Sequence, residues 1–167
     1  VGRATRLAEY VAHGPKSYRA EITFGVTTDS CDAEGDVESQ ADASGITIDD
    51  VAAHLPRFTG DIRQTPPAHS AIQIGGVRAY DLIRRQGEVV MPERAVTIYA
   101  FDIVRFVSGR RARLLADITC SRGTYIRALA RDLGTALGVG GVLSFLARLQ
   151  VGDCRLEDAV TLDALTA

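Results

Sequence analysis

The chain has 167 residues, of which 46% are hydrophobic and 24% charged, with a formal net charge of −2 at pH 7; this predicts one globular domain with its own core. No apolar run approaches the roughly 20 residues of a membrane-spanning helix, and neither a secretory leader nor a metal-ligand spacing of the three cysteines and three histidines is present. We therefore expect a cytoplasmic protein without a membrane span, a structural zinc site or a disulfide framework.

The first two elements are predicted from hydrophobic periodicity. Residues 2–13 place apolar side chains on one helical face and end before Gly14 and Pro15, which predicts an amphipathic helix. Residues 17–26 alternate between apolar and polar, which predicts a half-buried strand. The residues on the apolar side of this strand are Tyr18, Ala20, Ile22 and Phe24.

An acidic segment and a short helix follow. Residues 27–37, TTDSCDAEGDV, are too polar for a core and predict a loop. Residues 47–58 predict a short helix, because Thr47 and Asp50 form the Thr-x-x-Asp pattern of a capping box.

Residues 64–92 predict an excursion that protrudes from the domain as a binding loop. Pro66 and Pro67 forbid regular strand pairing, residues 70–74 predict a short strand, and two glycines then turn the chain into a basic helix. The arginines that we place on this helix are Arg78, Arg84 and Arg85.

The remaining chain alternates strands and helices. Strands are predicted over 94–107, 112–120 and 142–152, and helices over 124–137 and from 161. Strands predominate, and the predicted class is α+β, with a mostly antiparallel mixed sheet flanked by helices.

The entrance to the helix over 124–137, within CSRGTYIRALARDLG, carries Tyr125 and Arg127. We take Thr124 as its N-cap. A helix start favours acidic side chains because the backbone dipole is positive there, so this arginine needs a partner. Either it pairs with a surface acid while Tyr125 packs at the sheet edge, or it holds a carboxylate supplied by another part of the molecule.

Charge is distributed unevenly along the chain. Residues 27–61 carry nine acids and one arginine, a net of −8, whereas residues 62–152 carry thirteen arginines and six acids, a net of +7. Arginine grips phosphate and stacks on bases, so the basic middle is compatible with an RNA partner.

Five blocks of the sequence occur in the order and at the spacing of the TruB family of bacterial tRNA pseudouridine-55 synthases, which this chain resembles over nearly its whole length. The blocks are GRATRLAEY, KSYRAEITFGVTTDSCDAEGDV, TPPAHSAIQIGGVRAYDLIRRQGE, CSRGTYIRALARDLG and LARLQVG. The resemblance implies a pseudouridine synthase fold that isomerises a flipped-out T-loop uridine at tRNA position 55 without cofactor or metal. It also implies the T-arm of tRNA as partner, and we expect a monomer.

Residue roles follow from the resemblance, block by block. Tyr18 resembles the tyrosine that lies against the target base and assists proton removal at C5, and Tyr125 and Arg127 match the pocket tyrosine and the arginine paired with the catalytic aspartate. Asp32 matches an acid close to the nucleotide, and Leu146 a pocket-wall leucine that we also expect in the core. The RNA contacts assigned to the excursion are Ser70, Arg78, Arg84 and Arg85.

One part of the family pattern is missing. The catalytic aspartate of the family lies in a Gly-x-Leu-Asp-Pro segment before GRATRLAEY, and no Leu-Asp-Pro occurs in this sequence. We therefore expect residues 1–167 to be an internal fragment of the catalytic domain, inactive by itself. The alternative is a non-catalytic tRNA-binding or tRNA-folding module. On the catalytic hypothesis, Arg127 holds a carboxylate that this chain does not contain.

Overall fold

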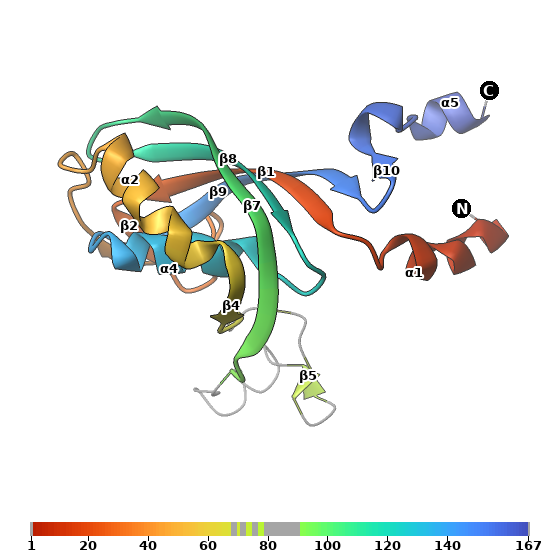
Figure 1. The fold of residues 1–167 in the computed structure, drawn as a ribbon, viewed down its shortest axis with the longest axis horizontal. Coiled ribbons are helices and arrows are strands. Elements are labelled where there is room, and N and C mark those ends of the chain that lie inside the picture. Colours follow the sequence, from red (N-terminus) through yellow and green to blue (C-terminus); the bar gives the residue numbers. More distant parts are fainter. Residues whose placement is uncertain (1, 68–69, 71–72, 75–76, 79–90, 167) are drawn as a thin grey trace.

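The computed structural model describes residues 2–67, 70, 73–74, 77–78 and 91–166. Its centre is a six-stranded antiparallel sheet in the order β10-β9-β1-β8-β7-β4 (Figure 1). The strands are β1 (Lys16–Phe24), β4 (Gly60–Gln64), β7 (Arg94–Val107), β8 (Arg113–Cys120), β9 (Gly141–Val151) and β10 (Cys154–Arg155). The predicted α+β class with a mostly antiparallel sheet is confirmed.

The first central strand follows the predicted alternation. In β1, every second residue from Tyr18 to Phe24 is buried, and this side faces the core. The residues between them are only partly buried, and on this second face Arg19 donates two hydrogen bonds of 2.8 Å to Asp117 of the neighbouring strand β8. One face of the sheet is thus apolar and the other polar, as period-two patterning requires.

The helix α4 (Ile126–Ala136) covers the apolar face of the sheet and contacts β9 and β1. Leu129 and Leu133 of α4 are almost completely buried in the core. The contact with β9 is close because Gly134 has no side chain: a Cβ there would lie 2.2 Å from the backbone nitrogen of Gly141. The short helix α2 (Ile48–His54) and the 3-10 turn η2 (Leu55–Phe58) add Val51 and Phe58 to the same core.

The acidic segment is more ordered than a simple loop. It lies between and overlaps the strands β2 (Val26–Thr28) and β3 (Val37–Gln40), which pair as a separate hairpin. The prediction that the segment is too polar for the core is wrong at Cys31, which is buried and has a positive φ of 60°. The reason is a tertiary contact: the Leu143 amide of β9 donates to the Cys31 carbonyl, at 3.1 Å.

In the excursion, β5 (Gln73–Ile74) pairs with β6 (Val77–Arg78). The prediction of a basic helix is therefore wrong at Arg78, which is a strand residue because its backbone pairs with Gln73. Arg84 and Arg85 lie outside the described residues.

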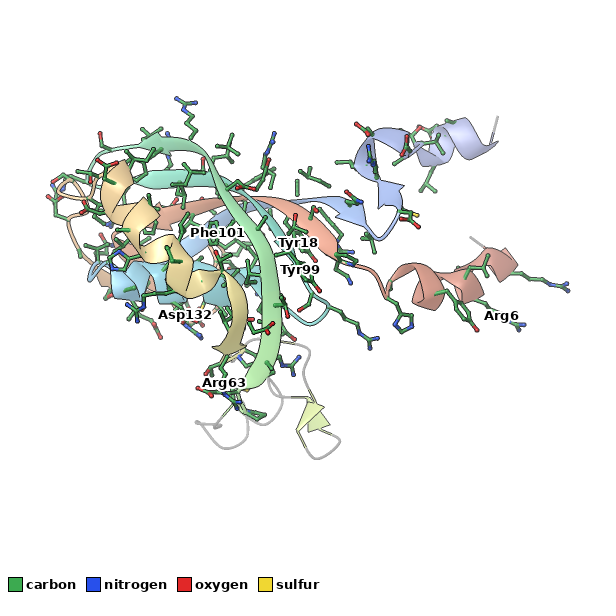
Figure 2. The ribbon with its side chains drawn as sticks, in the orientation of Figure 1. Arg6, Tyr18, Arg63, Tyr99, Phe101 and Asp132 are labelled. Atoms are coloured by element: carbon green, nitrogen blue, oxygen red, sulfur yellow. The ribbon has the colours of Figure 1, made fainter. Side chains whose placement is uncertain are left out.

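Both ends of the chain extend away from the sheet on the same side of the molecule (Figure 1). The predicted N-terminal helix consists of the 3-10 segment η1 (Gly2–Leu7) and the short α1 (Ala8–Val11), and Figure 2 shows Arg6 there, far from Tyr18. The other end forms η3 (Leu156–Asp158) and α5 (Leu162–Thr166). No helix in the described part of the chain is long and apolar enough to cross a membrane.

Candidate active site

A pocket of about 270 Å³ lies where β1, β9 and the start of α4 meet. Its lining combines aromatic, cationic and apolar side chains from segments far apart in the sequence. The lining residues are Tyr18, Pro67, Ser70, Thr124, Tyr125, Ile126, Arg127, Leu146 and Arg148. Tyr18, Tyr125 and Arg127, the three residues to which the resemblance assigns catalytic roles, therefore share one cavity.

Tyr18 lies on the core-facing side of β1 and is 8% exposed. The guanidinium of Arg148, at the paired position of β9, lies over its ring with the Cζ atom 5.6 Å from the ring centroid. Burial raises the pKa of the Tyr18 phenol above its ordinary value, and the neighbouring Arg148 partly offsets this rise. Tyr18 thus offers a flat, neutral ring to the pocket at neutral pH.

Tyr125 is the N-cap residue of α4, with an extended backbone (φ −105°, ψ 109°). The prediction of Thr124 as N-cap is wrong, because the Thr124 hydroxyl instead donates to the Ser121 carbonyl at 2.9 Å. The Tyr125 side chain itself makes no capping hydrogen bond. The side chain of Gln64 hydrogen-bonds the Tyr125 backbone instead.

Arg127 does not point into bulk solvent. Its Nη1 lies 3.0 Å from Oδ2 of Asp32, with side-chain exposures of 42% for the arginine and 14% for the aspartate. Arg127 therefore has one carboxylate partner, Asp32, within this chain. That it also holds a catalytic carboxylate from outside the chain stays a prediction. Asp32 comes from the acidic segment, which the tertiary fold brings against α4.

Local contacts fix the orientation of Asp32. Its backbone forms a bridge with Leu143 of β9, and its Oδ1 accepts hydrogen bonds from the Ser30 hydroxyl (2.7 Å) and the Glu34 amide (3.1 Å). The other carboxylate oxygen, Oδ2, is left to face Arg127. Asp32 lines a second cavity of about 210 Å³, which shares Arg127 and Leu146 with the first.

Leu146 and Ser70 also line the pocket, with opposite degrees of exposure. Leu146 is 43% exposed, so the expectation that it lies in the core is wrong: in β9 it faces the cavity. Ser70 is 8% exposed, and its Oγ has no hydrogen-bond partner among the described residues.

Sequence reasoning missed three residues around the pocket. Arg148 lies two residues after Leu146, and period two in a strand could have placed it on the same face. Arg94, whose Cζ lies 5.6 Å from the Tyr125 ring centroid, and the buried Gln64 had no comparable signal. Within the described ranges, no group of three or more His, Cys, Asp and Glu side chains could hold a metal ion.

Residues 1–126 match the TruB family pseudouridylate synthase (N terminal domain), and residues 127–167 match the tRNA pseudouridylate synthase B C-terminal domain. The boundary between the two matches falls inside α4. The two matches together span the whole chain.

Two curated relatives are each named tRNA pseudouridine synthase B. The one from Symbiobacterium thermophilum is 50% identical over 167 residues, which is 100% of this chain and 56% of the relative. The one from Moorella thermoacetica is 48% identical over 166 residues, 99% of this chain and 54% of the relative. The chain thus spans a little over half of the length of these relatives.

Solved structures show the same fold. A Cbf5-Nop10-Gar1 complex matches with a TM-score of 0.66 and 25% identity, over 96% of this chain and 37% of that one. The archaeal box H/ACA sRNP Nop10-Cbf5 complex matches with a TM-score of 0.62 and 25% identity, over 98% of this chain and 37% of that one. With family models that cover its whole length, the chain belongs to the TruB family of pseudouridine synthases.

Proposed function

We propose that the protein is a tRNA pseudouridine synthase that isomerises uridine 55 in the T-loop. The observation that carries this proposal is the single pocket that unites Tyr18, Tyr125 and Arg127. The relatives named tRNA pseudouridine synthase B support it. Residues 1–167 would then be part of one catalytic domain, and residues 64–92 its RNA-binding loop.

The reaction exchanges one glycosidic bond for another. The target uridine leaves its stack, its C1′–N1 bond breaks, and the uracil turns so that a C1′–C5 bond forms. The proton on C5 is lost and N1 gains one, so atoms and charge balance. Stacking against the Tyr18 ring offsets the base stacking lost on flipping, and its phenol oxygen assists removal of the C5 proton. Burial raises the pKa of this phenol overall, and Arg148 offsets part of that rise.

Arg127 would orient the catalytic aspartate expected from a preceding Gly-x-Leu-Asp-Pro segment. A guanidinium presents five N–H donors in one plane, and Asp32 is close to Nη1. Donors therefore remain for a second carboxylate, and a carboxylate beside an arginine stays ionised at neutral pH. Asp32 in this scheme fixes the guanidinium and lies close to the nucleotide.

RNA contacts would come from the rim of the pocket and from the loop. Ser70 and Leu146 line the pocket, and Arg78, Arg84 and Arg85 supply positive charge for the T-arm phosphates. We propose that the protein acts as a monomer in the cytoplasm.

The test is tritium release from tRNA that carries [5-³H]uridine, with the full-length gene product as enzyme. We expect stoichiometric release from wild-type tRNA and none from a matched tRNA that has cytidine at position 55. Salt-dependent tRNA binding without release would instead support the non-catalytic tRNA-binding module. The 167-residue chain alone should release no tritium, and release by it would contradict the requirement for a preceding aspartate.

A further inference from the structure

Gln64 is a buried polar residue that no catalytic role in the pocket requires. It is the last residue of β4 and is 1% exposed. Its Nε2 donates to the Tyr125 carbonyl at 3.1 Å, and its Oε1 accepts from the Tyr125 amide at 2.8 Å. The Gln64 carboxamide therefore satisfies both the backbone amide and the carbonyl of Tyr125, as a paired strand residue would.

These two bonds act where α4 begins. The Tyr125 carbonyl also accepts the Leu129 amide at 3.2 Å, which is the first hydrogen bond of the helix. Both lone pairs of this carbonyl are thus used, and the Tyr125 amide is held without any capping hydroxyl or carboxylate. Loss of Gln64 would leave a buried amide unpaired, which is costly, unless the backbone moves.

The ring of Tyr125 is held by Arg94, the neighbour of Gln64 on the paired strand β7. In the β4–β7 register, Gln64 pairs with Arg94, and the Arg94 guanidinium lies over the Tyr125 ring. A further contact anchors the following segment to α4: Arg131 donates to the Thr65 carbonyl at 2.8 Å. The end of β4 is consequently fixed to the first two turns of α4.

We propose that Gln64 is a positioning residue of the pocket, whose carboxamide sets the backbone of Tyr125 and thereby the direction in which Tyr125 and Arg127 enter the cavity. The inference rests on the proposed function for its effect on turnover. A displacement of about 1 Å in such side chains is enough to slow a reaction by about 10²-fold.

The test compares two variants of the full-length protein that make the same chemical change. Gln64→Met keeps the length of the side chain and removes both hydrogen bonds. Gln150→Met is the matched control, because Gln150 also donates to a backbone carbonyl at 2.7 Å, but that carbonyl belongs to Gly152, which does not line the pocket. Both are assayed at a temperature where circular dichroism shows them folded.

We expect kcat of Gln64→Met to fall by about 10²-fold with KM for tRNA within about 3-fold of wild type, and Gln150→Met to retain wild-type kcat. A purely structural role would lower the melting temperature of both variants without this split between kcat and KM. Wild-type kcat in Gln64→Met would overturn the proposal. If that variant does not fold, Gln64→Leu replaces it, since it also removes both hydrogen bonds; wild-type kcat there would equally overturn the proposal.

A second measurement needs no turnover. Hydrogen exchange of the Tyr125 amide should be faster in Gln64→Met than in wild type and unchanged in Gln150→Met. Unchanged exchange in Gln64→Met would overturn the positioning role. An inactive wild-type protein would instead refute the proposed function, and the exchange rate alone would then decide whether Gln64 holds Tyr125.

Discussion

The helices α2 and α4 begin in different ways. At α2, the Thr47 hydroxyl accepts the Asp50 amide and the Asp50 carboxylate accepts the Thr47 amide, at 3.2 Å and 2.8 Å. At α4, Gln64 supplies both bonds to Tyr125 from 61 positions earlier in the chain. The hydrogen bonds at the start of α2 form within four consecutive residues, whereas those at the start of α4 form only in the folded domain.

This difference coincides with function. The self-contained start of α2 lies away from the pocket, and the pocket forms at the start that other segments must complete. A helix entrance with a local cap has its backbone donors occupied by its own side chains. At α4, the side chains of Tyr125 and Arg127 can face a cavity, because Gln64 of the distant strand β4 holds the backbone at the helix start.

The largest expected effect comes from breaking the α4 entrance itself. Arg127→Ala in the full-length protein should lower kcat by about 10²–10³-fold, the usual cost of removing a charged group aimed at a reaction centre, and leave tRNA affinity nearly unchanged. Tritium release and filter binding measure the two quantities. Arg19→Ala is the control, because Arg19 also pairs with an aspartate and has a similar side-chain exposure of 43%, but does not line the pocket. Wild-type turnover of Arg127→Ala would contradict the catalytic assignment.

The packing of α4 can be broken without touching the pocket. Alanine is favoured over glycine in a helix by about 1 kcal/mol, but a Cβ at Gly134 would lie 2.2 Å from the Gly141 nitrogen. Gly134→Ala should therefore destabilise the protein by about 2 kcal/mol or more, measured by urea unfolding. Gly45→Ala, where no atom lies within 4 Å of the added Cβ, should change stability by less than about 0.5 kcal/mol. Equal stabilities would refute the close contact.

Removal of the cap of α2 should have a smaller effect, on stability alone. Thr47→Ala should cost about 1 kcal/mol of unfolding free energy and leave kcat unchanged, because α2 contributes no residue to the pocket. Thr47→Ser retains the hydroxyl and should recover most of the loss. A drop in kcat of Thr47→Ala below that of the serine variant would show that the two helix starts are coupled.

The smallest effect is expected at the ion pair on the opposite face of the sheet. Hydrogen bonds from Arg19 lower the pKa of the Asp117 carboxyl below its ordinary value, so the folded state binds a proton less readily than the unfolded chain. The stabilisation is thus present above the unfolded pKa of about 4 and is lost as pH falls through the lower folded value. Asp117→Asn should be slightly less stable than wild type at neutral pH and should converge with it in acid. A constant difference across this range would contradict the pairing.

Local patterns predicted much of the sheet. The alternation in β1, the strands β7 and β8 and the capping box of α2 were all read correctly, each from one short continuous segment. The acidic segment was misread at Cys31, because a contact with β9 buries a residue in a polar setting. Arg78 was misread as helical, since a two-residue strand leaves no periodicity to detect.

The sequence by itself determined which residues of β1 face the core and where most strands and helices lie. Its resemblance to the family singled out Tyr18, Tyr125 and Arg127. Only the tertiary structure decided that Asp32 pairs with Arg127, that Arg148 lies over Tyr18 and that Gln64 holds the start of α4. The physical reason is the sequence distance over which each kind of interaction acts. Periodicity and capping act over a few residues, whereas these contacts join segments 61 to 130 positions apart, and nothing local in the chain encodes which distant side chain will close them.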